Sequence, residues 1–312
     1  MFNQTTAQEL ALLGFGNLHQ MKGLLFFLFF LIYIATVTGN LLIIGLIATS
    51  STLHSPMYFF ICNLSLCEII FTSNIVPNML YVIWRELGTM TMYGCFFQFY
   101  VYCSSGSVEC LLLTAMAFDR YQAICNPLRY SSVMHSSACN HLVLGAWLFG
   151  FTIMSIITLT LLSTQSCGST VIDHIFCDLG PILELSIIDT HIIQSEALFI
   201  VITVGLFPFG FIIVSYGVIF WTILRIPSKL GRRKAFSTCS AHLVSVCTYF
   251  GTLFTIYLLP STQRSVKVNK VLSLLYIVVT PLFNPIIYGL RNREMKTSFG
   301  LFFYKVGGCV NI

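Results

Sequence analysis

Long apolar stretches recur along the chain, separated by short polar connections. A helix needs about 20 residues to cross the roughly 30 Å hydrocarbon core of a bilayer, and seven stretches are long enough. They are Gly23–Thr49, Met57–Ile83, Cys95–Ile124, Leu142–Ser163, Ala197–Leu224, Ala235–Leu259 and Val271–Leu290. Transmembrane β-strands are only about 10 residues long and alternate in polarity, so they do not fit these continuous runs. The pattern predicts an all-α membrane protein, a bundle of seven transmembrane helices.

Composition excludes a soluble fold of the same length. Of the 312 residues, 9% are charged and 56% are hydrophobic, whereas about 25% of the residues of ordinary globular proteins are charged. Such a chain needs lipid to cover its apolar surface. The net charge of +5 does not indicate nucleic-acid binding, because the basic residues gather in the connections predicted to face the cytosol.

Basic residues lie mostly on one side of the predicted membrane. The richer set of connections holds Arg120, Arg129, Arg225, Lys229, Arg232, Arg233, Lys234, Arg291, Arg293, Lys296 and Lys305. The other set holds Lys22, Arg85, Arg264, Lys267 and Lys270. Because basic connections stay in the cytosol, the N-terminus is predicted to lie outside and the C-terminus inside.

This orientation divides the chain into three parts. We expect an extracellular tail over residues 1–22, the bundle over residues 23–290 and a cytoplasmic segment over residues 291–312. Asn3-Gln4-Thr5 is a glycosylation sequon on the predicted outer tail. Basic residues followed by Phe299, Leu301 and Phe302 predict a short amphipathic helix that binds the inner lipid interface.

The longest predicted connection, about Thr164 to Glu196, is acidic and contains no lysine or arginine. It fits either a solvated loop or an acidic lid over a pocket. Three cysteines, Cys95, Cys167 and Cys177, fall at the predicted outer face, where disulfides persist. The sequence alone leaves their pairing open.

Five motifs occur in a fixed order over nearly the whole chain. They are Gly39-Asn40, LHSPMYFF (Leu53–Phe60), MAFDRYQAICNPLRY (Met116–Tyr130), KAFSTCSAHL (Lys234–Leu243) and PLFNPIIY (Pro281–Tyr288). Together they resemble the odorant receptors of the rhodopsin-like G-protein-coupled receptor family. The resemblance implies a receptor for small odorants that activates a stimulatory G protein and raises cAMP. It also implies the plasma membrane, and the cilia of olfactory neurons, as its location.

The resemblance also implies particular residue roles. It pairs Cys95 with Cys177. Because Ile187 stands where the family carries a third loop cysteine, the usual second bridge lacks its partner, and the sequence leaves open whether Cys167 is free or bridged. Asp119 holds Arg120 until activation releases it to the G protein, and the inner-face partners are Tyr216 and Tyr288.

Two carboxylic acids are predicted inside the membrane. Glu109 precedes Arg120 by eleven residues, or about 16 Å of helix, and lies near the bilayer centre. Glu68 stands where most rhodopsin-like receptors carry an aspartate. Two close carboxylates in a low dielectric share either a proton or a cation. We hypothesise a sodium site with Asn40 and Asn284; the alternative is one or both acids neutral and hydrogen-bonded.

The resemblance places a ligand pocket above these acids. Its expected lining is mostly apolar, as in other small-molecule pockets, and consists of Cys103, Gly106, Ser107, Ile200, Val204, Phe250, Leu253, Phe254, Tyr257, Leu274 and Ile277. An apolar or weakly polar volatile ligand is favoured, with an amine as the alternative because the outer loop is acidic. The order Tyr249-Phe250 reverses the family's usual Phe-Tyr, which moves one hydroxyl by about 100° around the helix.

Other functions fit less well. A retinal photoreceptor needs a lysine in the middle of the last helix, where Val278 stands. A transporter predicts repeated halves, which are not visible. No catalytic constellation supports an enzyme, and His174 and Asp178 are not expected to bind a metal beside a disulfide-bonded Cys177. A chemoreceptor expressed outside the nose is indistinguishable from a nasal one.

Overall fold

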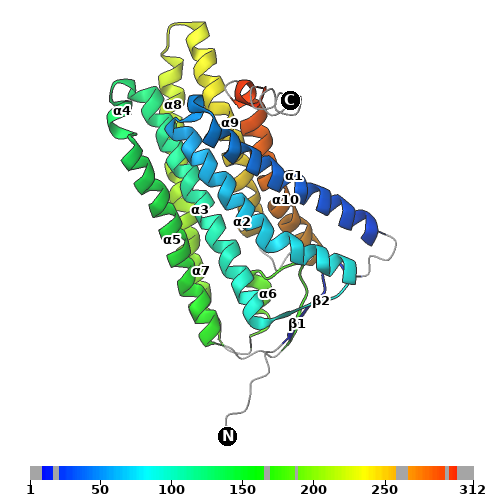
Figure 1. Ribbon diagram of the computed structural model, residues 1–312. Helices are drawn as coiled ribbons and strands as arrows, with labels where there is room; N and C mark the ends of the chain where they lie inside the picture. Colours follow the sequence, from blue (N-terminus) through cyan, green and yellow to red (C-terminus); the bar gives the residue numbers. More distant parts are fainter. Residues whose placement is uncertain are drawn as a thin grey trace, which may run out of the picture.

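Over the residues that the structure describes, the fold is a bundle of seven long helical rods (Figure 1). A computed structural model describes residues 9–16, 21–164, 169–186, 189–257, 266–291 and 295–300. Its rods are α1 (Lys22–Thr49), α2 (Pro56–Arg85), α3 (Met92–Cys125), α5 (Ser136–Ser163), the continuous α7 (His191–Ile200), η3 (Val201–Leu206) and α8 (Phe207–Leu224), α9 (Lys229–Tyr257) and α10 (Val266–Arg291). Each contains one of the seven predicted segments, except that the predicted ends Leu258 and Leu259 lie outside the described residues.

Six of these rods are long and apolar enough to cross a membrane in the part of the chain that the structure describes. Their outward faces carry large apolar side chains such as Leu24, Phe207 and Trp221, which are more than half exposed and suit a lipid surround. The seventh, α9, contains more hydroxyl residues and begins with a basic stretch. It packs along α10 inside the same bundle.

Several helices begin earlier than their apolar segments. The α9 helix starts at Lys229 rather than Ala235 because the basic residues before Ala235 have good helix propensity and continue the helix into water. The α3 helix starts at Met92, where the Thr91 side chain accepts a hydrogen bond from the Gly94 amide at 3.1 Å. Apolar length therefore predicts the membrane core of each helix but not its polar ends.

Prolines inside helices are accommodated by neighbouring helices. Pro281 and Pro285 lie within α10, and Asn40 of α1 donates from Nδ2 to the Pro281 carbonyl at 3.4 Å. A Cβ atom at Gly39 would lie 3.1 Å from Pro285 Cβ. Glycine at this position lets α1 approach the helix at its proline.

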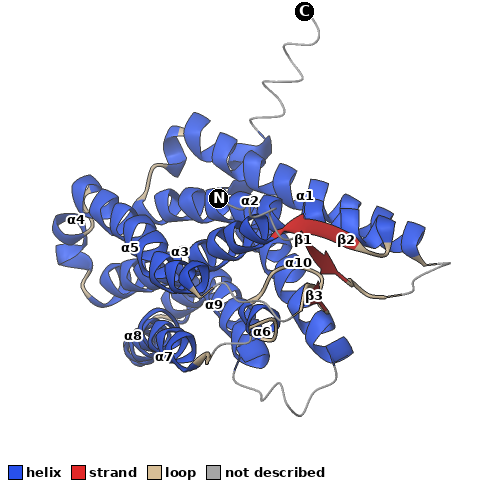
Figure 2. Ribbon diagram, turned by 90° about the horizontal axis from the view of Figure 1, so that it is seen from below, coloured by secondary structure: helices blue, strands red, loops and turns tan. Residues whose placement is uncertain are grey.

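A small sheet closes one end of the bundle, which we call the sheet end, and α4 (Tyr130–Val133) lies at the opposite end (Figure 1). Strand β1 (Glu9–Leu12) lies between antiparallel β2 (Gly88–Thr91) and parallel β3 (Val171–Ile172), as Figure 2 shows along the bundle. Leu10 and Leu12 of β1 are buried. Part of the segment expected as a tail is thus a strand that covers the helix ends.

The predicted amphipathic segment is described over residues 295–300, which are helical. Met295 and Ser298 are buried, whereas Lys296 and Phe299 are exposed. The Ser298 hydroxyl lies 3.1 Å from that of Ser50, at the end of α1. Asn3, Cys167, Ile187 and Lys305, on which other predictions rest, lie outside the described residues.

The central helix is α3, which packs against α2, α5 and α8. Its approach to α5 depends on a glycine. A Cβ atom at Gly150 would lie 2.8 Å from Val108 Cγ2 and 3.1 Å from the Val108 backbone nitrogen. Backbone cannot move aside as a flexible side chain can.

We therefore expect Gly150→Ala to destabilise the protein by about 1–3 kcal/mol through overpacking. Gly145→Ala, on the same helix, is the matched control because a Cβ atom there meets nothing within 4 Å. Thermal unfolding of the purified protein in detergent measures both. Equal melting temperatures for the two variants would contradict the close packing of α3 on α5.

Candidate functional site

A disulfide joins the first turn of α3 to the loop that follows β3. Cys95 and Cys177 are bonded, and both are fully buried. This is the pairing that the resemblance implied. Residues 169–178, called the bridged loop below, are thereby held against the sheet end of the bundle.

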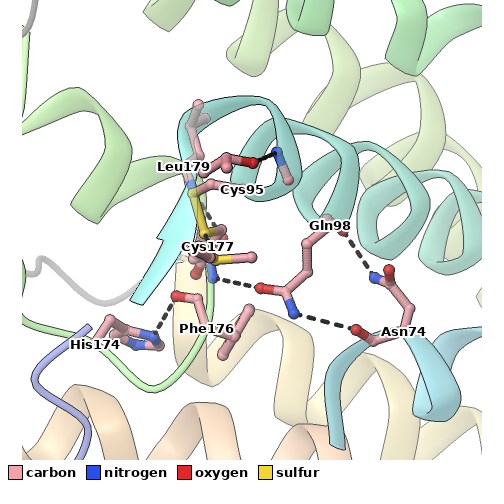
Figure 3. The surroundings of a disulfide bond; sticks show 11 residues. Asn74, Cys95, Gln98, His174, Phe176, Cys177 and Leu179 are labelled. Atoms are coloured by element: carbon pink, nitrogen blue, oxygen red, sulfur yellow. Dashed lines mark hydrogen bonds between the residues drawn. A yellow bond between two sulfur atoms is a disulfide. The ribbon is translucent and has the colours of Figure 1, made fainter. Parts of the chain in front are cut away.

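Gln98 fixes the bridged loop a second time (Figure 3). Its Oε1 atom accepts a hydrogen bond from the Cys177 amide at 3.0 Å, and its Nε2 atom donates to the Asn74 carbonyl at 3.1 Å. Asn74 in turn donates to the Gln98 carbonyl at 2.8 Å. One buried amide therefore ties the loop, α3 and α2 together.

The bridged loop inserts an aromatic ring among the helices. Phe176 is fully buried, and its ring centroid lies 5.1 Å from that of Tyr102 on α3. Tyr102 contacts Phe71 of α2 and Tyr276 of α10 at 5.5 and 6.3 Å. The bridged loop is thus not merely a solvated connection, because its centre is part of the core, and the reading as an acidic lid stays a prediction.

The acidic groups of the loop are engaged by the protein itself. Asp173 accepts a hydrogen bond from Lys270 of α10 at 2.5 Å. Asp178 caps α6 (Leu179–Leu183) by accepting from the Leu179 amide at 2.8 Å. Further along, Glu196 of α7 accepts from Thr160 of α5 at 2.9 Å. Among the described residues, no group of three histidine, cysteine or acidic side chains could hold a metal.

His174 of the bridged loop is buried, within electrostatic range of Lys270 of α10. Its ring lies 4.8 Å from that of Phe176, and Nδ1 donates to the Phe176 carbonyl at 3.2 Å. Burial lowers the pKa of His174 to about 4, and the nearby Lys270 ammonium acts in the same direction. The imidazole is therefore neutral at physiological pH.

The residues predicted to contact ligand come from α3, α7, η3, α9 and α10. Phe250 and Ile277 are fully buried, Ser107, Ile200 and Val204 are nearly so, and Cys103, Leu253, Phe254 and Leu274 are half-buried. Their contact with a ligand stays a prediction. The Tyr257 side chain lies outside what the structure describes. Val204 lies in η3, a π-helical stretch of a kind frequent at functional sites.

The reversed order of Tyr249 and Phe250 places the hydroxyl group and the phenyl ring against different helices. The Tyr249 hydroxyl is buried and donates to the Gly106 carbonyl at 2.7 Å, whereas Phe250 packs on Phe209 of α8, with centroids 5.0 Å apart. Tyr276 donates to the same Tyr249 oxygen at 3.4 Å. A Cβ atom at Gly106 would lie 3.3 Å from the Tyr276 hydroxyl oxygen. The hydroxyl thus faces α3, and the phenyl ring faces α8.

The intramembrane acids meet among four helices. Asn284 of α10 donates to Glu68 Oε1 of α2, and Glu109 of α3 lies within electrostatic range of Glu68. Asn40 of α1 bonds the Thr36 carbonyl at 3.1 Å. Glu68 Oε2, Glu109 Oε1 and Asn40 Oδ1 are buried without a hydrogen-bond partner among the described residues. A shared proton or a cation would give these buried oxygens a partner.

Arg120 is held at the α4 end of α3. Its Nη2 atom lies 2.7 Å from Asp119 Oδ2, and Tyr130 of α4 donates to Asp119 Oδ1 at 2.8 Å. Burial and the adjacent carboxylate raise the pKa of Tyr130, which keeps this hydroxyl protonated. Asp119 is fully buried, whereas 13% of the Arg120 side chain is exposed.

A histidine connects the neighbouring helices to α3. His242 of α9 lies with Nδ1 2.7 Å from the Tyr216 hydroxyl of α8 and donates from Nε2 to the Leu113 carbonyl at 3.1 Å. Tyr288 of α10 is also buried and lies within electrostatic range of Tyr216. Both predicted inner-face tyrosines therefore lie inside the bundle in this structure.

The comparisons with known proteins agree along nearly the whole chain. The olfactory receptor family model matches residues 29–304. The chain belongs to the olfactory receptor family. Human olfactory receptors 10A7, 10A3 and 10C1 are 44%, 41% and 43% identical to it, covering 94%, 95% and 95% of this chain and 93%, 94% and 95% of their own lengths.

Membership of the family carries the general function. Olfactory receptors bind odorants and signal through G proteins, and they are multi-pass membrane receptors rather than enzymes. The structure adds residues that the sequence reasoning missed. Gln98, Tyr102 and Phe176 gave no sequence signal beyond their nearness to Cys95 and Cys177. His242 lies inside the KAFSTCSAHL motif, which could have drawn attention to it.

We expect His174 to make the stability of the receptor depend on pH. Because its folded pKa of about 4 is below the ordinary value of 6.5, the unfolded chain binds more protons between these values. The contribution of His174 to the free energy of unfolding is therefore full above pH 6.5. It falls as the pH drops towards 4, by about 2 kcal/mol at pH 5.

The His174→Asn variant, which keeps a donor for the Phe176 carbonyl, should have a melting temperature that depends less on pH than that of the purified wild type. His191→Asn, at an exposed position, is the control, and equal slopes for all three proteins would refute the assignment.

Proposed function

We propose that the receptor binds small, mostly apolar odorants near its sheet end and activates a stimulatory heterotrimeric G protein, which raises cAMP. The supporting arrangement is the continuity of α3 from Cys95 to Arg120, about 37 Å of helix. The same helix carries Cys95, which is bonded to the bridged loop, Tyr102, which contacts Phe176, and Arg120, which is paired with Asp119. A ligand that displaces α9 or α10 relative to α3 can therefore act on Arg120.

In this proposal the sheet end is extracellular and the α4 end cytoplasmic. The basic residues at the start of α9 support the orientation, as does the disulfide, because such bonds persist in the oxidising extracellular space. Residues 1–22 then form the outer segment, with Asn3 as its glycosylation site, and residues 291–312 the inner one, on the lipid surface. Olfactory neuron cilia are the proposed location.

The proposed output is the release of Arg120. In the described packing, Asp119 and Tyr130 hold the arginine, while His242 holds Tyr216 against α3. Outward movement of α9 would separate His242 from the Leu113 carbonyl and free Tyr216. Arg120 could then exchange Asp119 for acceptors on the G protein.

We also propose that a sodium ion binds at the intramembrane acids Glu68 and Glu109, beside Asn40 and Asn284. Sodium prefers oxygen ligands, and the unpartnered Glu68, Glu109 and Asn40 oxygens supply three from three helices. An ion there would cancel carboxylate charge and hold the helices in the present packing, which opposes activation.

Arg120→Ala should abolish the odorant-induced rise in cAMP while ligand binding and surface expression persist. Ligand binding is measured as an odorant-induced rise in the melting temperature of purified receptor. The matched control is Arg129→Ala, at an exposed position nine residues further along. A normal cAMP response in Arg120→Ala would contradict the switch. Failure of the wild type to raise cAMP despite surface expression would contradict stimulatory coupling.

Replacing extracellular sodium with choline should lower the odorant EC50 of the wild type by about fivefold or more, because the ion opposes activation. Glu68→Gln should remove this dependence. Glu196→Gln is the control, since that carboxyl bonds Thr160 instead. A sodium-independent wild-type response would exclude the ion and leave protonated acids as the explanation.

A further inference from the structure

Lys270 is a buried cation near the sheet end of α10. Among the described residues it is the one lysine or arginine that is buried, with 6% of its surface exposed. Its partner, Asp173 of the bridged loop, has a side chain that is 48% exposed, against 8% for the side chain of Lys270. The ammonium therefore lies on the inner side of the pair, and the carboxylate faces the surface.

The ion pair leaves hydrogen-bonding capacity on the lysine. An ammonium has three N–H donors, and Asp173 Oδ1 is the acceptor that the described residues supply. A buried donor without an acceptor is costly, so a further acceptor beside Lys270 is favoured. Asp173 meanwhile prevents the buried charge from standing alone.

Lys270 lies on the same face of α10 as two residues of the proposed odorant site. Leu274 and Ile277 follow it by four and seven residues and share its face of α10, and both belong to the proposed ligand lining. On the loop side, His174 lies within electrostatic range of Lys270 and packs on Phe176, the ring that enters the bundle. The ammonium thus stands between the loop and the proposed lining.

The charges around this position select among ligand classes. A ligand amine would be repelled by Lys270, and Asp173 and Asp178 already accept hydrogen bonds from the protein. A carboxylate would place a second negative charge beside Asp173. A neutral carbonyl oxygen accepts a hydrogen bond from the ammonium while the ion pair stays intact and the local net charge stays zero.

We propose that Lys270 is a ligand-specificity residue whose ammonium donates a hydrogen bond to the carbonyl oxygen of a neutral odorant, an aldehyde, ketone or ester. Asp173 is its positioning residue. The inference rests on the proposed odorant site and narrows the class of ligand that the site accepts.

Pairs of probes that differ in the carbonyl group test the proposed hydrogen bond from Lys270. Dibutyl ketone is compared with dibutyl sulfide, and octanal with octane, first by cAMP in cells and then by the ligand-induced rise in melting temperature. For the wild type, the EC50 of each carbonyl probe should be at least about tenfold lower than the EC50 of its partner without a carbonyl group. This is the difference expected for a hydrogen bond to a charged donor. Lys270→Met should remove this advantage, and Lys270→Arg, which keeps charge and donors, should retain most of it.

The Asp173→Asn variant distinguishes recognition of the carbonyl group by Lys270 from an ion pair that only stabilises the fold. Asparagine still offers an oxygen to the ammonium, so the carbonyl advantage should persist, with both members of each pair shifted by the same small factor. Equal potency of ketone and sulfide in the wild type would overturn the proposal. So would a Lys270→Met variant that weakens both members of a pair equally, or a receptor that responds only to compounds without a carbonyl group.

Failure of the proposed function has a different signature. If carbonyl probes stabilise the purified receptor but raise no cAMP, the stimulatory coupling is wrong and the Lys270 inference stands. If no odorant of a broad panel stabilises the receptor or activates it at the cell surface, the proposed odorant site fails, and the inference fails with it.

Discussion

Much of the receptor's sheet end depends on the covalent bond between Cys95 and Cys177. The bond fixes the bridged loop at the first turn of α3, and Gln98 repeats the attachment one turn further along. With those two points fixed, Phe176 enters the bundle and Asp173 reaches Lys270. Strand β3 then lies where β1 can pair with it and with β2. Cys95 and Cys177 are 82 residues apart in the sequence, so bringing them together costs conformational entropy. A covalent bond holds them together more firmly than a reversible contact would.

The same helix connects this end to the α4 end. Along α3, Gly106 receives the Tyr249 hydroxyl, Glu109 faces the Glu68 region, and Arg120 is held by Asp119. The α9 helix is joined to α3 by two hydrogen bonds to backbone carbonyls, from Tyr249 near the middle and from His242 nearer the α4 end. Such bonds tolerate side-chain variation on α3 but are sensitive to displacement of α9.

Apolar length alone predicted the seven helices, because the bilayer demands about 20 residues per crossing. It could not predict the polar ends, such as Lys229 at the start of α9, where helix propensity decides. The disulfide pairing came from family resemblance, since three outer cysteines allow more than one bridge. Strand β1 gave no signal: it is four residues long, and its partners lie about 80 and 160 residues away. The inward position of Phe176 and the binding of Lys270 to Asp173 likewise follow from where the disulfide places the loop, and local sequence does not encode this.

Disulfide mapping tests the dependence on Cys95 and Cys177 most directly. Receptor purified from the cell surface would be alkylated without reduction, digested, and its linked peptides identified by mass spectrometry. The account predicts a peptide linked through Cys95 and Cys177. Cys95 linked to Cys167, or alkylated itself, would contradict the placement of the bridged loop and the Lys270 contact that follows from it.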